Sequence, residues 1–333
     1  MMSILGFIAC ALVILYCGKK LSFYGDIISY RSGLGKAWVG LILLSTVTSL
    51  PELMVGISSS AIVQSADLAV SDVLGSCAFN LGLLAVLDAF MPKQSALLST
   101  ASQKHVLAAV MGIILVAMAG IGIFLPDEMS IIPFIGITSI LFIVIYLWSI
   151  RLLYLYDRKT AVIETKDEQN VEGIISLKKA IQHFIFFALI TVVAALFLPY
   201  LADQIAEMTH LGKSFVGTLF LATSTSLPEI AVSIAAVRMG SLDLAVGNLF
   251  GSSIFNIVIL AVDDIFYTKG KLLKDASDVN LISIFAVIIM SAIAIVGLTY
   301  RSGNKRYKLA WDSALIFLVY IVNLIVLYRL TSL

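Results

Sequence analysis

The chain has 333 residues, of which 60% are hydrophobic and 13% are charged, with a mean hydropathy of +1.03 and a formal net charge of +1. A soluble globular domain has roughly 45–50% apolar and about 25% charged residues. The composition therefore excludes an ordinary soluble domain and predicts an all-α polytopic membrane protein. We expect the lipid bilayer as its surroundings and no nucleic-acid partner.

Ten segments are apolar enough to be membrane spans, each of which needs about 20 residues as a helix. In chain order they are 3–18, 37–63, 68–91, 104–125, 131–154, 180–202, 213–239, 243–266, 279–300 and 310–330. The polar stretch 156–179 separates the first five from the last five. We therefore predict a first five-helix repeat at 1–155, a cytoplasmic linker at 156–179 and a second five-helix repeat at 180–333. Because five is an odd number, the second repeat enters the membrane from the opposite side, so the repeats are inverted.

The basic residues indicate an orientation. On one side of the predicted membrane the loops carry 17 of the 22 Lys and Arg residues, and the positive-inside rule places that side in the cytoplasm. We predict a multi-pass protein of the cell (inner) membrane with both termini extracytoplasmic. Lys19 and Lys20 follow the first hydrophobic segment rather than precede it, which favours a retained helix over a signal peptide.

A duplicated motif is the most informative feature of the chain. The tetrapeptide Ser49–Glu52 in the second span recurs 177 residues later as Ser226–Glu229 in the seventh. The third and eighth spans carry matching segments, 67–80 and 243–256, and each ends on an asparagine. A duplicated hydrophobic pair that is interrupted by Pro and Gly and contains carboxylates indicates a secondary transporter with its site between the repeats.

The motif prolines predict broken helices at the membrane midplane. Pro51 and Pro228 each remove a helical hydrogen bond, which frees carbonyl groups near 45–47 and 222–224. Such carbonyls are tolerated at that depth only where protein, water or an ion satisfies them. We expect Gly75-Ser76 and Gly251-Ser252 to break the partner spans as well and to allow close backbone approach.

The motif side chains predict a site for a hard cation. An ionised glutamate at the bilayer centre costs at least about 2.5 kcal/mol, and a cation between Glu52 and Glu229 would offset that cost. Asn80 and Asn256 add amide oxygens, and neighbouring hydroxyls complete an oxygen ligand set that suits Ca²⁺ or Na⁺. In the other interpretation the glutamates are protonated and only bridge helices.

Further polar residues near the motifs allow several interpretations. Asp72 takes the place that Asn248 has in the second repeat; it could add charge near the ion path or face solvent at a helix mouth. Together with Cys77, these two residues are candidates for the ion path. Asp88 and Asp264 each lie eight residues after a motif asparagine, and functional and structural roles are equally open for them.

The motif pair resembles the alpha repeats of the cation/Ca²⁺ exchanger superfamily, most of all those of prokaryotic Na⁺/Ca²⁺ exchangers. The resemblance implies that Glu52 and Glu229 are Ca²⁺ ligands that Na⁺ also uses. It further implies that the ions are surrounded by ligands from Thr48, Ser49, Ser76, Asn80, Thr225, Ser226, Ser252 and Asn256. Ser45 and Ala222 match positions that contribute backbone carbonyls. It also implies alternating access in which the helices at 3–18 and 180–202 slide across a static core.

These observations together predict a secondary-active antiporter that exchanges Na⁺ for Ca²⁺. An H⁺/Ca²⁺ exchanger is the nearest alternative, and the many hydroxyl ligands favour Na⁺ over it, because protons need only the carboxylates. A passive cation channel is disfavoured by the two broken half-sites. The chain lacks the Gly-x-Ser-x-Gly and His-Glu-x-x-His patterns of hydrolases. We expect no enzymatic activity, no cofactor and no obligate protein partner.

Overall fold

The computed structural model describes residues 2–92, 95–124, 136–164, 175–208, 223–301, 305 and 308–331, and the regular structure within these ranges is helical. The first part contains α1 (Met2–Ser32), α2 (Lys36–Val39), the π-helical η1 (Gly40–Leu44), α3 (Ser45–Thr48), α4 (Leu50–Ser58), η2 (Ser59–Val63), α5 (Ala66–Phe90), α6 (Leu97–Thr100), α7 (Lys104–Phe124) and α8 (Ile137–Glu164). The second part contains α9 (Leu177–Met208), α11 (Leu227–Arg238), α12 (Leu242–Phe266), α13 (Leu272–Asp275), α14 (Asn280–Tyr300) and α15 (Trp311–Thr331).

Within the described ranges, nine helical segments are long and apolar enough to cross a membrane. They correspond to predicted spans one to six and eight to ten. Of predicted span seven, 213–239, the structure describes only the part from residue 223 on, which includes α11. The all-α polytopic membrane fold is thus confirmed, whereas the count of ten spans and their inverted arrangement stay predictions.

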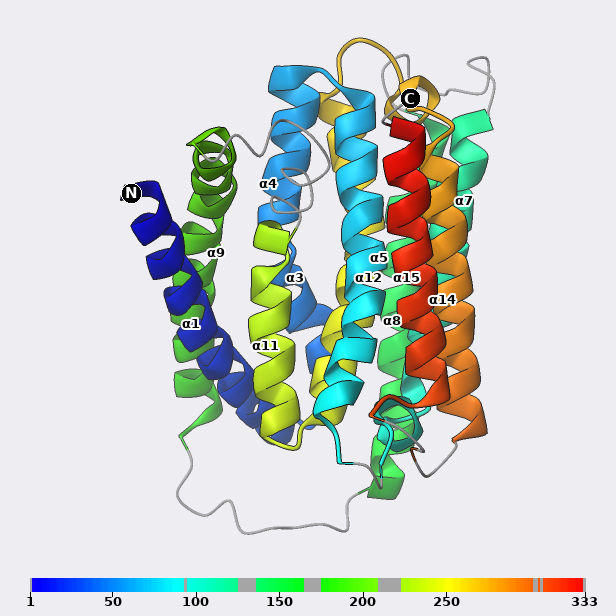
Figure 1. The fold of residues 1–333 in the computed structure, drawn as a ribbon. Coiled ribbons are helices and arrows are strands. Elements are labelled where there is room, and N and C mark those ends of the chain that lie inside the picture. The colour runs from blue at the N-terminus through cyan, green and yellow to red at the C-terminus, as the bar shows by residue number, and fades with distance from the viewer. Residues whose placement is uncertain are drawn as a thin grey trace. The chain divides into compact units, whose positions relative to one another are not determined.

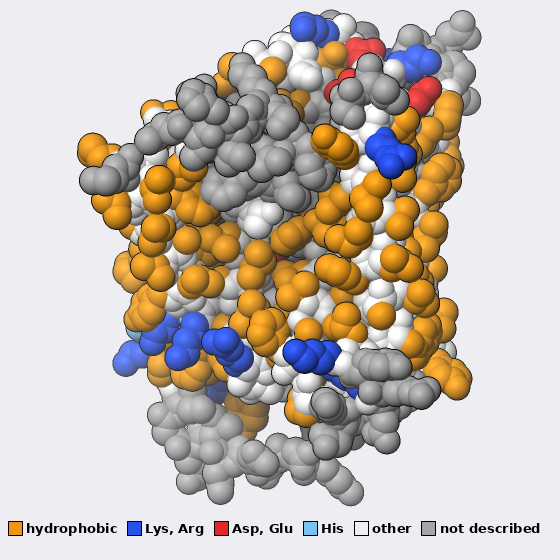
Figure 2. Space-filling model, viewed as in Figure 1, with side chains coloured by type: hydrophobic (Ala, Val, Ile, Leu, Met, Phe, Trp, Pro, Cys, Tyr) orange, Lys and Arg blue, Asp and Glu red, His pale blue; other side chains and the backbone are white. Residues whose placement is uncertain are grey.

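Hydrophobic side chains cover the outward faces of several helices. Leu5 and Leu12 on α1 are each 61% exposed, and Leu189 on α9 is 62% exposed. Figure 2 shows mostly hydrophobic side chains over these two helices, with Lys and Arg gathered toward their lower end in this view. Exposed apolar surface of this extent is typical of helices that cross a membrane.

The chain forms two compact units, and each draws on both predicted repeats. The first unit comprises 1–51 and 150–251, and the second comprises 52–149 and 252–333. In the first unit α1 packs along α9 and against α11 (Figure 1), with Ile14, Leu198 and Ala231 in its core. In the second unit α14 packs against α5, α7 and α15. The repeat boundaries predicted along the sequence stay a prediction.

Both motif helices are interrupted one residue before the Leu-Pro-Glu sequence. Ser49, between α3 and α4, has φ −89° and ψ 6°, and Ser226, which precedes α11, has φ −83° and ψ 8°. These nearly equal dihedral angles lie in the sparsely populated bridge region between helix and strand. The breaks predicted from Pro51 and Pro228 are therefore present in both copies, and the two copies share their geometry.

The predicted breaks in the partner spans are wrong, because α5 and α12 each run unbroken for 25 residues. A single glycine inside a helix costs only about 1 kcal/mol relative to alanine, which packing can outweigh. Of the two motif glycines Gly75 and Gly251, only Gly251 is approached closely by another backbone segment. A Cβ on Gly251 would lie 2.1 Å from the carbonyl oxygen of Leu41, whereas a Cβ on Gly75 would meet nothing within 4 Å.

This difference predicts opposite effects for one substitution in the two repeats. Gly251→Ala should lower the free energy of unfolding by about 1–3 kcal/mol, because the new methyl group overlaps the backbone of η1. Gly75→Ala should be neutral or stabilise by up to about 1 kcal/mol through helix propensity. Thermal unfolding of the two purified variants in detergent measures this, and equal Tm values would contradict the assigned packing.

Candidate functional site

In the first unit, hydroxyls from the first repeat lie beside polar groups from the second. The Ser49 hydroxyl donates to Oε1 of Glu229 at 3.3 Å, and the Thr48 hydroxyl donates to Oδ1 of Asn248 at 3.3 Å. All four residues are at most 1% exposed. The break at Ser49 therefore places two consecutive hydroxyls against α11 and α12, in contact with the motif glutamate and with a candidate of the ion path.

Asn248 links three helices in this unit. Besides accepting from Thr48 on α3, its amide nitrogen donates to the hydroxyl of Ser233 on α11 at 3.1 Å. Both ends of the amide are thus used within the protein. These contacts give Asn248 a role in positioning Thr48, and its place on the ion path stays a prediction.

The other predicted ligands of this unit have different surroundings. The Ser45 carbonyl accepts from the Ser49 N–H at 2.9 Å and from the Thr48 hydroxyl at 3.3 Å. Thr225 and Ser226 are buried at the second break. Ala222 lies outside the described residues. The assignment of Ser45, Thr225 and Ser226 as ion ligands stays a prediction.

In the second unit, Glu52 lies near the third and eighth predicted spans. Glu52 is 1% exposed. The Cys77 thiol is close enough to Glu52 to interact with it electrostatically, and it is hydrogen-bonded to the side chain of Asn256. The thiol also donates to the carbonyl oxygen of Ser253 at 3.5 Å. Glu52, Cys77 and Asn256 therefore share one buried polar region formed by α4, α5 and α12.

Several motif oxygens in this unit are buried without a hydrogen bond. Among the described residues no hydrogen-bond partner exists for the Ser76 hydroxyl, for Oδ1 of Asn80 or for Oδ1 of Asn256. Leaving such a group unsatisfied costs about 1–3 kcal/mol. These are hard oxygen donors that suit Ca²⁺ or Na⁺. Within the described ranges no group of three or more His, Cys, Asp or Glu residues could hold a metal, so a cation here depends on amide and hydroxyl oxygens beside a carboxylate.

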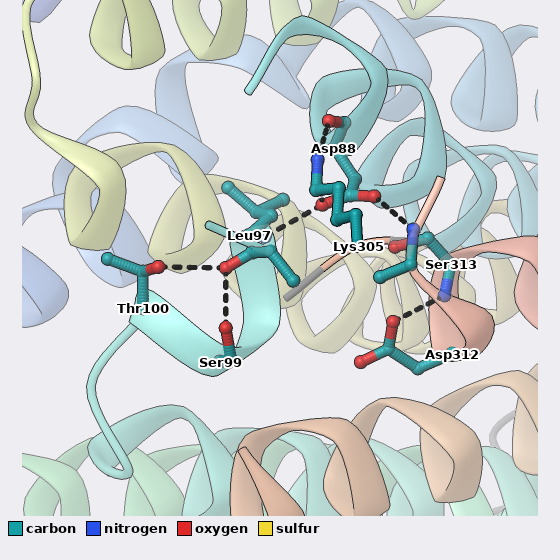
Figure 3. Close-up of polar contacts among 9 residues, drawn as sticks. Asp88, Leu97, Ser99, Thr100, Lys305, Asp312 and Ser313 are labelled. Carbon is teal, nitrogen blue, oxygen red and sulfur yellow. Dashed lines mark hydrogen bonds and ion pairs between the residues drawn. The ribbon is translucent and has the colours of Figure 1, made fainter. Parts of the chain in front are cut away.

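Asp88 is held in a structural cluster (Figure 3). Its carboxylate accepts the N–H of Leu97 at 2.7 Å and that of Ala310 at 2.8 Å. It also pairs with Lys305 at 2.8 Å, and neither side chain has any exposed surface. Leu97 is the first residue of α6, so the carboxylate caps that helix and ties it to the chain before α15.

Asp264 makes the corresponding contacts with residues of the first repeat. It accepts the N–H of Leu272, the first residue of α13, at 2.8 Å and that of Gly136 at 2.7 Å. The Ser139 hydroxyl donates to it at 2.6 Å. Gly136 precedes α8 as Ala310 precedes α15, so each repeat's aspartate accepts an N–H from the other repeat. These contacts give Asp88 and Asp264 a structural role.

Asp263, which precedes Asp264 on α12, is not among the residues predicted from the sequence. Asp263 has no exposed surface, and its carboxylate lies where a Cβ on Gly56 would stand, with Oδ2 at 2.4 Å from that position. The available signal was a second carboxylate inside an otherwise apolar span. Its significance depends on Gly56, which lies on a different helix.

Comparisons with known proteins give a consistent result. The model of the sodium/calcium exchanger protein family matches residues 2–152 and 179–329, and each segment holds one copy of the motif. The inner membrane protein YrbG of Escherichia coli (strain K12) is 30% identical over 271 residues, which are 78% of each chain. The sodium/calcium exchanger MaX1 of Methanosarcina acetivorans is 32% identical over 124 residues, 37% of this chain and 33% of that protein. A solved structure of the sodium-calcium exchanger NCX_Mj has the same fold, with a TM-score of 0.74, 21% identity and 97% of both chains covered.

Proposed function

The chain belongs to the sodium/calcium exchanger family, and from this premise we propose that it exchanges Na⁺ for Ca²⁺ across the membrane. As a member it is a multi-pass membrane transporter and not an enzyme. In our proposal Na⁺ enters the cytoplasm and Ca²⁺ leaves it, and Glu52 and Glu229 are the carboxylates for which the two ions compete. Competition prevents both ions from being carried at once, which is the requirement for antiport. The exchange needs no cofactor.

The observation that carries the proposal is the set of buried oxygens without partners in the second unit. Ser76, Asn80 and Asn256 occupy motif positions, and the Ser76 hydroxyl and the two amide oxygens have no hydrogen-bond partner within the described part of the chain. A cation with an oxygen shell would satisfy them and would compensate the charge of Glu52. We extend the ligand set to the remaining motif residues: Glu229, Ser45, Thr48, Ser49, Ala222, Thr225, Ser226 and Ser252.

The choice of Na⁺ as the counter-ion follows from the kind of ligand. A proton needs only a carboxylate, whereas Na⁺ needs several neutral oxygens around it. The hydroxyls of Thr48 and Ser49 lie on consecutive residues, and Ser49 contacts Glu229 directly. This arrangement supports Na⁺, and H⁺/Ca²⁺ exchange is the alternative that the experiment must exclude.

We propose that α1 and α9 move during alternating access. The two helices pack together in the first unit, and α1 contacts α11 through small residues. A Cβ on Gly18 would lie 2.7 Å from the Cβ of Ala231, and the Ser22 hydroxyl donates to the Val232 carbonyl at 2.7 Å. Small side chains leave a smooth contact along which α1 can slide, with one hydrogen bond to exchange.

In the proposed orientation the protein lies in the cell (inner) membrane, and both of its termini are extracytoplasmic. The 17 basic residues on the predicted cytoplasmic loops support it. The test of this orientation uses variants that lack the three native cysteines and carry a single new cysteine at residue 2 or at residue 166. Each variant is treated with a membrane-impermeant thiol reagent. Only the first should react in intact spheroplasts.

The test of function is ⁴⁵Ca²⁺ uptake into proteoliposomes. Vesicles loaded with Na⁺ and diluted into Na⁺-free buffer should accumulate Ca²⁺, and vesicles loaded with choline should not. Vesicles loaded with acid and free of Na⁺ form the third arm. Uptake in that arm alone would replace Na⁺ by H⁺ as the counter-ion, and uptake in all arms would indicate a channel.

Cys77→Ser is expected to change this uptake by less than about twofold. A serine hydroxyl can donate to the Ser253 carbonyl as the thiol does and is the harder donor of the two. The residue at the matching position of the second repeat is Ser253 itself. Initial uptake rates of the variant and the parent check this, and loss of transport would show that the first half-site needs the thiol.

A further inference from the structure

The two repeats differ in a coordinated way one helical turn beyond the motif glutamates. In the second repeat, Ser233 follows Glu229 by four residues and accepts a hydrogen bond from Asn248 at 3.1 Å. In the first repeat the residues at these two places are Gly56 and Asp72. The second repeat thus has two neutral side chains that hydrogen-bond to each other. The first repeat has a glycine without a side chain and an aspartate that can carry a charge.

The space at Gly56 is taken by a third residue. The carboxylate of Asp263 lies against Gly56, where a Cβ would come to 2.4 Å from Oδ2 and 2.6 Å from Oδ1. At the matching place in the first repeat the chain has an apolar residue, Leu87. Gly56, Asp72 and Asp263 therefore form an arrangement in the second unit that has no counterpart at Ser233 and Asn248.

Asp263 and one carboxylate oxygen of Asp72 are buried, and no hydrogen-bond donor among the described residues contacts them. Asp263 has no exposed surface, and neither of its oxygens has a hydrogen-bond partner among the described residues. Asp72 is close enough to repel it electrostatically, and Oδ2 of Asp72 is likewise buried without a partner. The neighbouring Asp264 also repels Asp263, but its own oxygens are used by Gly136, Ser139 and Leu272. Two buried like charges are costly unless something positive binds them.

We propose that Asp72 and Asp263 form a second Ca²⁺-binding site, beside Gly56. Two carboxylates balance a divalent ion, and hard oxygen ligands suit Ca²⁺. Gly56 lies four residues after Glu52 on α4, so the site is one helical turn, about 5–6 Å, along that helix from the motif carboxylate. This inference rests on the proposed Ca²⁺ exchange, for which the site is a station on the way to Glu52.

The accessibility of the two carboxylates supports this order. Asp72 is partly exposed, whereas Asp263 and Glu52 are buried. An ion that first meets Asp72 thus passes to a deeper carboxylate and then along α4. Ser60, four residues after Gly56 and in the π-helical η2, carries a buried hydroxyl that has no partner within the described ranges.

The first test is equilibrium ⁴⁵Ca²⁺ binding to the purified protein in detergent. A Glu52→Gln/Glu229→Gln variant should keep one bound Ca²⁺ per chain, and adding Asp72→Asn and Asp263→Asn should remove it. Because this background lacks the motif carboxylates, the result is independent of whether the protein exchanges Na⁺ for Ca²⁺. No Ca²⁺ binding in the Glu52→Gln/Glu229→Gln variant, or unchanged binding after the two further substitutions, would overturn the proposal.

The second test uses transport in the parent background. Asp72→Asn/Asp263→Asn should raise the Ca²⁺ concentration for half-maximal uptake by about tenfold, as expected when two charged ligands are neutralised, with the maximal rate within about twofold. Asp278→Asn, an exposed aspartate in the loop after α13, is the matched control and should leave uptake unchanged. An unaltered half-maximal concentration in the double variant, or a change confined to its pH dependence, would contradict a Ca²⁺ site.

Thermal unfolding separates loss of the site from loss of the fold. In Ca²⁺-free buffer the double variant should be at least as stable as the parent, because two repelling charges are gone, and the Ca²⁺-induced rise in Tm should shrink. The triple variant Gly56→Ser/Asp72→Asn/Asp263→Leu recreates the residues of the opposite repeat. Its Tm in Ca²⁺-free buffer and its Ca²⁺-induced rise in Tm should change in the same directions as those of the double variant. A fall in Tm of the double variant in Ca²⁺-free buffer would show that the pair serves the fold instead.

Discussion

Neutralising either motif glutamate, by Glu52→Gln or Glu229→Gln, is expected to reduce Na⁺-driven Ca²⁺ uptake at least about 100-fold. Each substitution removes a charged ligand at membrane depth, where neutral oxygens alone do not replace it. The fold should persist, because the Ser49 hydroxyl that donates to Oε1 of Glu229 can donate equally to the amide oxygen of glutamine. Uptake into proteoliposomes, normalised to the amount of inserted protein, gives the measurement.

The controls for this prediction address charge and stability. Glu52→Asp and Glu229→Asp keep the charge and should retain partial uptake with a weaker apparent affinity for Ca²⁺. The Tm of each glutamine variant in Ca²⁺-free detergent should be equal to or above that of the parent, since a buried charge has been removed. Uptake at the parent rate in either glutamine variant would refute the assignment of that glutamate.

The buried pair of Asp88 and Lys305 predicts the largest effect on stability. Asp88→Asn should lower the free energy of unfolding by about 3–5 kcal/mol, because it leaves the ammonium group of Lys305 buried without a counter-charge. It also replaces one carboxylate oxygen by an NH₂ donor, so that either the N–H of Leu97, which Oδ1 accepts, or that of Ala310, which Oδ2 accepts, loses its acceptor. Thermal unfolding followed by circular dichroism measures the loss.

A double variant distinguishes the pair from the cap. Asp88→Asn/Lys305→Met removes both charges and should recover much of the loss, since well-packed apolar replacements of buried pairs are often nearly neutral. Asp264→Asn, at a cap where no lysine of the described residues pairs with the carboxylate, should cost less, about 1–3 kcal/mol. Equal losses at the two aspartates would show that Lys305 contributes nothing to the first cluster.

The spans and the helix breaks could be predicted because their causes are local. Hydrophobic length decides the spans, and proline acts on its own helix, so Pro51 and Pro228 were sufficient to locate the breaks at Ser49 and Ser226. The two motif glycines were not equivalent, although their sequences match. Gly251 meets the backbone at Leu41 while Gly75 faces open space, and this difference depends on the neighbouring helix.

The acidic pair could not be found from the sequence for the same kind of reason. Asp263 on its own is an ordinary residue near the end of a hydrophobic segment. Its burial matters only because Gly56, on a helix far away in the chain, leaves room for its carboxylate and because Asp72 lies near it. The presence of Asp72 where the second repeat has Asn248 could be seen in the sequence, whereas the burial of Asp263 beside Gly56 could not.

The crossed caps at the two aspartates mean that neither half of the chain is self-sufficient. Asp88 accepts the N–H of Ala310, and Asp264 accepts that of Gly136. Each half therefore contains a buried carboxylate whose hydrogen-bond donor lies in the other half. Two polypeptides cut within 160–175 should therefore accumulate only when they are produced together. A single half, made alone, would have to pair with a second copy of itself in the opposite orientation, as a subunit of a dual-topology homodimer does.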